Sequence, residues 1–368
     1  MTILVRQSFG ECVRQAKSAH AGLLLTRGLP VWEDKEKTAK AGLIDTIVAI
    51  KPCSLYEKAF VRWQAGTADP ARFSSLTASI EGRMMIGLST GGAMETGVTT
   101  HHTYGMPMIP GSSVKGAVRA YAHATGIPAE YQAVLFGADE DLAQAPGVSE
   151  GAGCLVWHDA WWSPDSGVAP FVGEVVTVHH QEYYGGKGEA TDFDSPVPNQ
   201  QLAVQGSFYF VVEGPTEWAT LAQRLLRETL TKQGIGAKRA AGYGFLTENK
   251  ALVEKQAKKL KEAAEALKKE AAARALEESM TNLTANQRII QEFRAKLTGN
   301  SAWQNGNPGM DPMGFGALEK TVAEWTDPAD LKFAFQMFDE NLKLWLKKPW
   351  KDTKWKERMN TLKQRAGL

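Results

Sequence analysis

The stretch from residue 234 to residue 244, GIGAKRAAGYG, combines glycines with adjacent cations in a way that suits phosphate binding. Two Gly-x-Gly pairs flank Lys238 and Arg239. Glycines let one backbone approach another closely, and neighbouring cations attract phosphates. A dinucleotide fingerprint needs a strand, then glycines, then a helix, and a triphosphate loop needs GxxxxGK[ST]; neither order is present. A flexible helix-to-strand turn without a ligand is the alternative interpretation.

The second stretch, IPGSSVKGAVR at residues 109–119, has the composition of a helix start that binds anions. A Pro–Gly pair precedes Ser112 and Ser113, either of which can cap a helix that we expect from Ser113 to about Thr125. Free N–H groups at a helix start attract anions, and hydroxyls and cations add to the attraction. An ordinary capped helix explains the same residues. The polar members are Ser112, Ser113, Lys115 and Arg119.

Two histidine pairs and one aspartate pair are the candidates for catalysis or metal binding. Imidazoles titrate near neutral pH, so His101–His102 and His179–His180 could supply a general acid and a general base. Neighbours in a strand point to opposite faces, so each pair gives one ring at most to a site. Polar or structural histidines without a catalytic role are the alternative. Asp192 and Asp194 have the spacing of a Mg²⁺-binding pair, but a structural hairpin loop explains them as well.

An α+β core is expected to position these residues. Its order, β–α–β–β–(β)–α–β, is typical of a ferredoxin-like or RRM-like fold with a long hairpin insertion. Gly206 is expected to form a bulge or a register change within the strand Leu202–Val212, and Thr216–Lys232 an amphipathic helix. Strands are predicted from Ser79 to about Leu88 and around Gly153–Trp162, Gly173–His180, Leu202–Val212 and Gly242–Thr247.

The chain is expected to have three parts. Residues 1–78 form a helical or irregular segment packed on the core, residues 79–249 form the RRM-like core, and residues 250–368 form an all-helical C-terminal module. Within this module, Lys343 to Arg365 holds nine basic and two acidic residues, with Trp345, Trp350 and Trp355 among them. Basic residues interleaved with aromatic ones can bind single-stranded RNA, but plain helical packing remains open.

Composition limits the function classes. Hydrophobic residues make up 43% and charged residues 23% of the 368 residues, which fits two folded units. The sequence has no signal peptide and no apolar run of about 18 residues, so we expect a cytoplasmic protein without a membrane partner. Three scattered cysteines give no zinc pattern, and we expect no cofactor or metal. Residues 1–250 carry a net charge of −4 and residues 251–368 one of +5, so RNA binding by the core requires a local patch or an assembly.

Together, the two motifs make the sequence resemble the RAMP superfamily of CRISPR-associated proteins. The marks of that superfamily are an IPGSSxKGxxR segment after the first strand and a glycine-rich loop ending in GYG before the last. The chain is most similar to the sixth subunit of the type III-B (Cmr) effector complex, over roughly residues 55–247. Further matching segments are RWQ at 62–64, GLSTGGAMETG at 87–97, HHTYGMPMIPGSSVKG at 101–116 and TDFDSPVP at 191–198.

The resemblance implies a non-catalytic RNA-binding subunit that caps a ribonucleoprotein filament near the 3′ part of the guide RNA. Its implied partners are the guide (CRISPR) RNA, the target RNA and the other Cmr subunits. A RAMP-type endoribonuclease that processes guide RNA or cuts target RNA is the alternative, although the family's target cleavage belongs to a different, repeated subunit. The implied contacts with the RNA backbone are Ser112, Ser113, Lys115, Arg119, Gly234, Gly236, Lys238, Arg239, Gly242, Tyr243 and Gly244.

Overall fold

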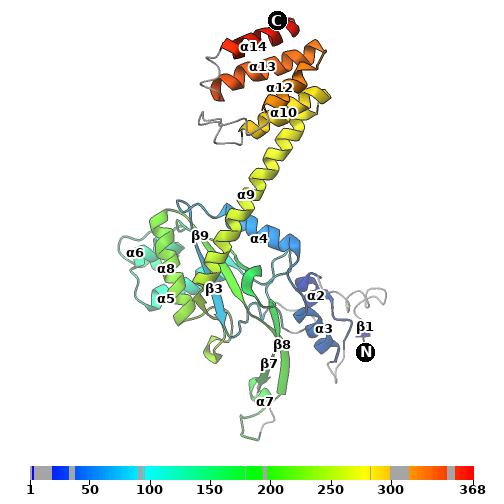
Figure 1. Ribbon diagram of the computed structural model, residues 1–368. Helices are drawn as coiled ribbons and strands as arrows, with labels where there is room; N and C mark the ends of the chain where they lie inside the picture. The colour runs from blue at the N-terminus through cyan, green and yellow to red at the C-terminus, as the bar shows by residue number, and fades with distance from the viewer. Residues whose placement is uncertain are drawn as a thin grey trace. The chain divides into compact units, whose positions relative to one another are not determined.

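The computed structural model describes residues 2–3, 19–32, 38–89, 94, 96–178, 180–193, 197–281, 283–298, 315–345 and 353–368. The chain divides into two compact units, Met1–Glu262 and Ala263–Leu368, which are considered separately (Figure 1). The division lies inside helix α9 (Lys250–Met280), whereas the sequence suggests a boundary after residue 249. Within the described ranges, no helix is both long enough and apolar enough to span a membrane.

A six-stranded antiparallel sheet with the order β10-β3-β9-β6-β4 forms the centre of the first unit, and β5 pairs with β9. One helix follows β4 and a second follows β9, which confirms the expected α+β, RRM-like arrangement. The elements of this core are β3 (Phe73–Glu81), β4 (Met108–Ile109), α5 (Gly111–Ala124), α6 (Ala129–Phe136), β5 (Val156–Trp157), β6 (Ala160–Trp162), β9 (Ser207–Glu213), α8 (Thr216–Lys232) and β10 (Phe245–Glu248).

Two strand predictions need correction. The first strand of the core, β3, runs from Phe73 to Glu81 rather than from Ser79 to about Leu88, because β9 pairs with it from Phe73 onward and Met84 and Met85 form only isolated bridges. Gly206 is a turn between two strands of different sheets, and neither a bulge nor a register change within one strand. Its φ is +99°, and a Cβ there would lie 2.8 Å from the Trp162 Nε1 atom, so both the turn and the packing require glycine.

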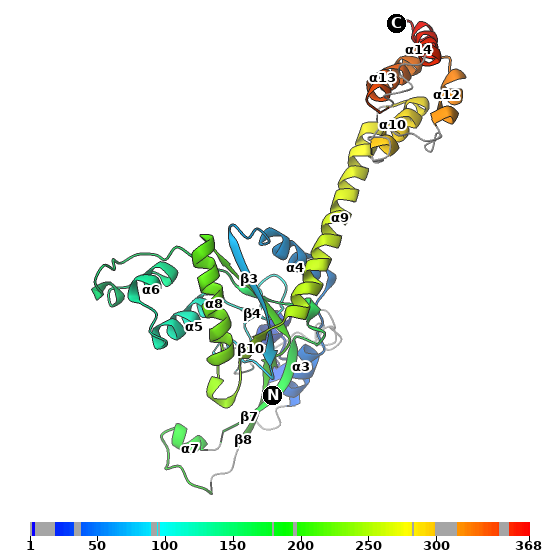
Figure 2. The ribbon, with the colours of Figure 1, turned by 60° about the vertical axis from the view of Figure 1, so that its left-hand side comes forward.

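The main hydrophobic core lies between one face of the sheet and helices α5 and α8. The inward-facing side chains of β3 and β9 alternate with residues that face the opposite side, as the period of a strand requires. Figure 2 shows α8 on one side of β3 and the start of α9 on the other. The buried residues include Leu76, Ala78, Phe208, Phe210 and Val212 from the strands and Val114, Val118, Ala122, Leu225, Leu226 and Leu230 from the helices.

The opposite face of the sheet is also covered. Phe60 of α4 (Ser54–Gly66) packs on Tyr209 and Val211 of β9. The first turns of α9 lie on the same face, where Gln256 is 3% exposed. Its Oε1 atom accepts from the Thr77 hydroxyl (3.0 Å), and its Nε2 atom donates to Ser163 Oγ (2.9 Å). Thr77, Ser163 and Gln256 thus satisfy one another on this face, whereas the buried Nε1 atom of Trp63 has no hydrogen-bond partner among the described residues.

A long hairpin is inserted between β6 and β9, as the sequence predicts. It consists of β7 (Phe171–Val178) and β8 (Val197–Val204), with the short helix α7 (Gln181–Tyr184) near its tip. Helix α3 (Thr38–Val48) packs against both strands. The remaining N-terminal elements are β1 (Thr2–Ile3), α2 (Ala21–Arg27) and β2 (Val31–Trp32).

The second unit is helical and has a hydrophobic core of its own. Asp330 is 3% exposed and accepts from the Thr284 hydroxyl (2.6 Å) and from Asn286 Nδ2 (2.8 Å). Trp350 and the side chains of Trp345 and Trp355 lie outside the described part, so the predicted RNA contact by this basic segment stays a prediction. The helices are the last part of α9, α10 (Ala285–Thr298), α12 (Phe315–Ala323), α13 (Pro328–Trp345) and α14 (Thr353–Arg365).

Candidate nucleic-acid interface

A groove of about 550 Å³ joins the two motifs of the sequence. One wall is helix α5, the other is the glycine loop (residues 234–244), and the segment 84–89 after β3 lies between them. Of the predicted contact residues, Ser113, Gly234, Gly236 and Arg239 line this groove. The full lining is Met84, Ile86, Gly87, Leu88, Ser89, Ile109, Ser113, Gly116, Ala117, Ala120, Gln233, Gly234, Ile235, Gly236, Ala237 and Arg239.

The glycines of the loop allow its backbone to pack closely against other backbone segments of the same chain. The Ile235 amide donates to the Gly244 carbonyl (2.8 Å), and the Ala237 amide donates to the Met85 carbonyl (2.8 Å). Gly236 has a φ of +99°, and a Cβ there would lie 2.5 Å from the Met85 carbonyl oxygen. A Cβ on Gly244 would collide with the Ile235 carbonyl. These glycines therefore hold the loop against residues 83–85 and fix one wall of the groove.

The tip of the loop presents two cations. Lys238 has a φ of +57° and is the one non-glycine residue with a positive φ in the described ranges. This conformation costs about 1–2 kcal/mol and is followed by the helical turn Arg239–Ala241, a succession that points consecutive N–H groups into one concavity. Lys238 and Arg239 are both exposed, and neither has an acidic partner among the described residues. The loop tip therefore suits an anion.

The start of α5 differs from the prediction. The helix begins at Gly111 after Pro110, and no side chain caps it, so the prediction that Ser112 or Ser113 caps the helix is wrong. Instead, Asp159 Oδ1 accepts from the Gly111 amide (2.7 Å). Because this carboxylate already uses one free N–H group of the helix start, the two exposed serines contribute their hydroxyls rather than a cap.

The two predicted cations of α5 differ in their surroundings. Arg119 Nη2 lies 2.5 Å from Asp139 Oδ2, and this hydrogen bond is the main cause that lowers the pKa of the Asp139 carboxyl. Lys115 is half-buried and has no acidic partner among the residues with described positions. Arg119 is thus neutralised within the chain, while Lys115 is available to a phosphate.

The end of the glycine loop lies outside the groove lining. Gly242 has open space where a Cβ would be placed, and its φ of +88° explains the glycine without a ligand. Tyr243 is half-buried; desolvation chiefly raises the pKa of its hydroxyl, and the nearby Glu174 carboxylate adds to the effect. Gly244 is a closing residue of the loop. The predicted RNA contacts of Gly242, Tyr243 and Gly244 remain predictions.

Among the residues with described positions, the two histidine pairs do not come together as a general acid and a general base. His101 Nδ1 accepts from the Thr103 amide (3.2 Å), and its ring centroid lies 4.5 Å from that of Trp161. Burial is the main cause that lowers the pKa of His101, so its ring is neutral at pH 7. His179 and Asp194 lie outside the described residues, and Asp192 is exposed. In the described ranges, no three His, Cys, Asp or Glu side chains gather where they could hold a metal.

The sequence interpretation missed the small residues that open the groove. Ser113, Gly116, Ala117 and Ala120 lie on one face of α5, at the three- and four-residue spacing of a helix. A Cβ on Gly116 would meet open space. A helical face made only of small residues is a signal that could have indicated a groove.

The sheet itself offers no platform for bases. RRM domains stack bases on aromatic side chains of the sheet face that their helices leave open. Here, Phe60 and the start of α9 cover that face, and Tyr209 and Thr77 are 6% and 2% exposed. The groove beside the glycine loop is therefore the better candidate.

Comparisons with known proteins gave one family match and several similar solved structures. The model of the RAMP superfamily matches residues 77–247. No curated protein matches the sequence. Among similar solved structures is one described as the cryo-EM structure of the type III-B Cmr-beta bound to cognate target RNA, at 20% identity and a TM-score of 0.45, over 66% of this chain and 86% of that chain. The crystal structure of Cmr6 from Pyrococcus furiosus gives 22% identity and a TM-score of 0.30, over 48% and 98% of the two chains. A chain of a structure described as a CRISPR RNA-guided surveillance complex is 17% identical, with a TM-score of 0.31, over 48% of this chain and 66% of that chain.

Proposed function

Residues 77–247 of this chain are a RAMP superfamily core, and on that premise we propose that the protein is a non-catalytic RNA-binding subunit of a type III CRISPR ribonucleoprotein. In this role it caps the filament near the 3′ part of the guide RNA, beside the other Cmr subunits. The observation that carries the proposal is the groove, because it brings both motifs of the superfamily to one place.

The charges around the groove support a phosphate-bearing ligand. Arg239 lines the groove and Lys238 precedes it in the loop, and neither has an acidic partner in the described part of the chain. Lys115 has none either but is not part of the groove lining, and Arg119 is paired with Asp139. Cations that are already paired gain little from a phosphate, while unpaired ones gain the full attraction. Because residues 1–250 carry a net charge of −4, this local patch is expected to bind RNA weakly unless partner subunits complete the site.

The lining of the groove supports recognition of the RNA backbone rather than the bases. None of the sixteen described lining residues is aromatic, so among them only the Arg239 guanidinium offers a plane on which a base could stack. Ser113 and the backbone amides of the loop suit phosphates and 2′-hydroxyls. Guide RNA of any sequence can then be held, as an RNA-guided particle requires.

Assembly of the whole particle tests this role. Co-expressed with its partner subunits and a guide, the chain should copurify as one copy at one end of the particle. Ultraviolet crosslinks to the guide should fall on residues 84–89, 111–120 and 233–239. A particle that forms and cuts its target normally without this chain, or guide crosslinks confined to other surfaces, would contradict the proposal.

The non-catalytic part has its own test. Single alanine substitutions should leave target cleavage by the assembled complex intact at each of the six candidate positions. A loss of about 100-fold in one variant that still assembles is the effect of a missing acid or base, and it would favour the endoribonuclease alternative. The positions are His101, His102, His179, His180, Asp192 and Asp194.

A further inference from the structure

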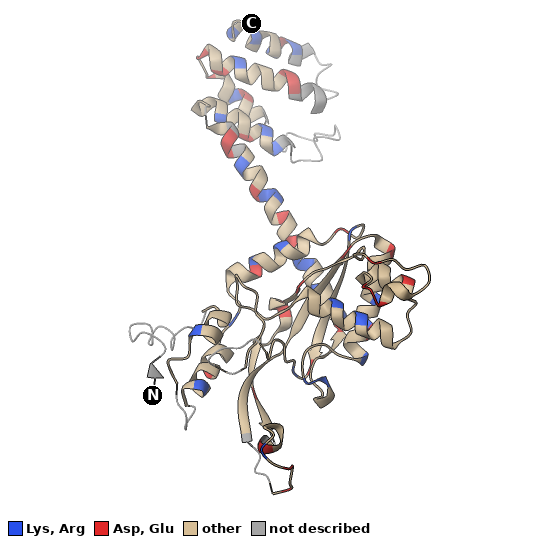
Figure 3. Ribbon diagram, turned by 180° about the vertical axis from the view of Figure 1, so that it is seen from behind, with Lys and Arg blue, Asp and Glu red and all other residues tan. Residues whose placement is uncertain are grey.

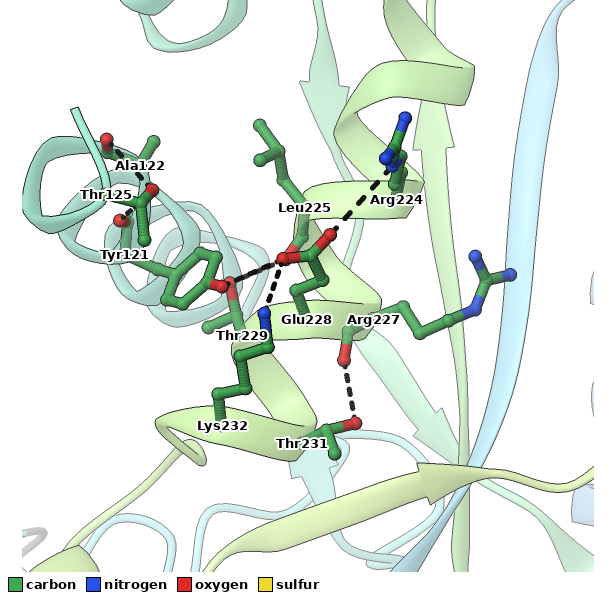
Figure 4. A network of polar contacts seen from close by, with 10 residues as sticks. All are labelled: Tyr121, Ala122, Thr125, Arg224, Leu225, Arg227, Glu228, Thr229, Thr231 and Lys232. Carbon is green, nitrogen blue, oxygen red and sulfur yellow. Dashed lines mark hydrogen bonds and ion pairs between the residues drawn. The ribbon is translucent and has the colours of Figure 1, made fainter. Parts of the chain in front are cut away.

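One carboxylate links helix α5, a wall of the groove, to helix α8, whose end leads into the glycine loop. Glu228 of α8 accepts at Oε2 from the Tyr121 hydroxyl of α5 (2.9 Å) and from Lys232 Nζ (3.0 Å) (Figure 4). Arg224 Nε lies 3.9 Å from the other carboxylate oxygen. Hydrogen bonds from Lys232 and Tyr121 are the main causes that lower the pKa of Glu228, so the carboxylate is ionised at neutral pH.

The partners of Glu228 lie next to groove residues on opposite walls. Tyr121 directly follows Ala120, which lines the groove from α5. Lys232 directly precedes Gln233, which lines it from the side of the glycine loop. Tyr121 as a whole is 7% exposed, whereas the Glu228 side chain that accepts from its hydroxyl is 36% exposed, so this bond lies at the edge of the packed contact between α5 and α8.

We propose that Glu228 is a positioning residue that sets the separation of the groove walls and thereby the fraction of molecules able to accept an RNA backbone. The inference rests on the proposed function. Glu228 itself contacts no RNA in this account, and it acts through Tyr121 and Lys232. If the hydroxyl bond is lost, the walls can separate, and the apparent Kd rises as the competent fraction falls.

The ion pair between Glu228 and Lys232 also keeps the Lys232 charge from binding RNA. Lys232 lies at the loop's entry and would otherwise be a third phosphate ligand beside Lys238 and Arg239. Substituting Glu228 alone would therefore release a positive charge while loosening the walls, and the two effects on affinity oppose each other. Tyr121→Phe avoids this difficulty, since it removes the hydroxyl and leaves every charge in place.

The test is the affinity of the full-length chain for a fluorescently labelled single-stranded oligouridylate. Tyr121→Phe should raise Kd about fivefold, which lies within the range expected for one lost hydrogen bond at a partly exposed site, with the salt slope unchanged. Tyr209→Phe is the matched control. It removes a hydroxyl of similar burial, which bonds to Thr67 Oγ1 (2.9 Å) on the other face of the sheet, and it should leave Kd unchanged. Melting temperatures of both variants report any general loss of stability.

Measuring the same substitution in a Glu228→Ala protein distinguishes an effect that acts through Glu228 from a general loss of structure. In a Glu228→Ala protein, adding Tyr121→Phe should have no further effect on Kd, because the acceptor is already gone. An equal effect of Tyr121→Phe in both backgrounds, or no effect in the wild type, would overturn the proposal. If the Lys238/Arg239 double variant still loses salt dependence in that case, the proposed function stands. If that double variant binds RNA as the wild type does, the proposed function fails and the inference fails with it.

Discussion

Replacing Lys238 and Arg239 together with alanine should reduce the salt dependence of RNA binding without unfolding the protein. Both side chains are exposed and without acidic partners in the described ranges, so their removal breaks no ion pair. The loop is held by backbone hydrogen bonds to Met85 and Arg83, which the substitutions leave in place. We therefore expect a change in free energy of unfolding within about 0.5 kcal/mol.

The size of the effect follows from counterion release. Each phosphate contact on a single strand contributes about 0.7 to the slope of log K against log salt. Two lost contacts lower the slope by about 1.4, so the advantage of the wild type should shrink about sevenfold when salt rises from roughly 50 to 200 mM. This ratio is independent of the absolute affinity, which we expect to be micromolar or weaker for the isolated chain.

Fluorescence anisotropy of a labelled single-stranded RNA, titrated with full-length protein at several salt concentrations, measures this slope. Arg119→Ala is the matched control, because Arg119 is a predicted contact whose charge Asp139 already neutralises. Its slope should stay close to that of the wild type. Parallel lines for the wild type and the double variant would refute the assignment of the loop tip as a phosphate site. An Arg119 variant with an equal loss of slope would refute the argument from charge pairing.

Three further perturbations have defined outcomes. A chain ending at Glu262 should fold and keep its groove, whereas one ending at Asn249 should lose about 3 kcal/mol in urea unfolding, because Leu252 and Gln256 leave the sheet face. In the assembled particle, the chain ending at Glu262 should protect fewer guide nucleotides from nuclease only if the second unit binds RNA. Asp330→Ala should destabilise the second unit by about 1–3 kcal/mol in denaturant, since Thr284 and Asn286 both lose a buried carboxylate acceptor, while the exposed Glu340→Ala should change little. Burial lowers the folded-state pKa of His101, so the neutral ring stabilises the protein above the ordinary histidine pKa, and this stabilisation is lost as pH falls through the folded-state value. The melting temperature should therefore fall more between about pH 7.5 and 5 for the wild type than for His101→Asn. Equal falls in the two proteins would contradict this.

The sequence predicts the helices of the core better than its strands, for a physical reason. Helix α8 has a wide apolar face, and its predicted bounds, Thr216–Lys232, agree with the structure. β3 begins with FSSLTA, in which polar and apolar residues are mixed, yet Leu76, Thr77 and Ala78 are all buried although they point to both faces of the sheet. Thr77 is buried because the Gln256 side chain, far along the chain, accepts its hydroxyl. The sequence pattern around Thr77 gives no indication of a hydrogen-bond partner so far along the chain.

The candidate site shows the same division between local and distant information. The composition of the glycine loop is local, and its place in the groove follows from the predicted order of helix and strand. The neutralisation of Arg119 depends on Asp139 in a loop twenty residues away, and the start of α5 depends on Asp159 in a third segment. These two contacts decide which predicted residues are free to bind, and both arise only when the chain is folded.

The docked start of α9 has a consequence for how the rest of that helix forms. Most of its described residues beyond Gln256 are exposed, so tertiary packing stabilises little of this segment. An isolated helix must first form a costly nucleus, while adding residues to an existing one is nearly neutral in free energy for sequences rich in Ala, Glu and Lys. The Asn249 side chain accepts from the Leu252 amide (3.0 Å), and Leu252 and Gln256 hold the first turns on the sheet. The folded core thus acts as a template from which the exposed helix propagates, and unfolding of the core should melt that helix with it.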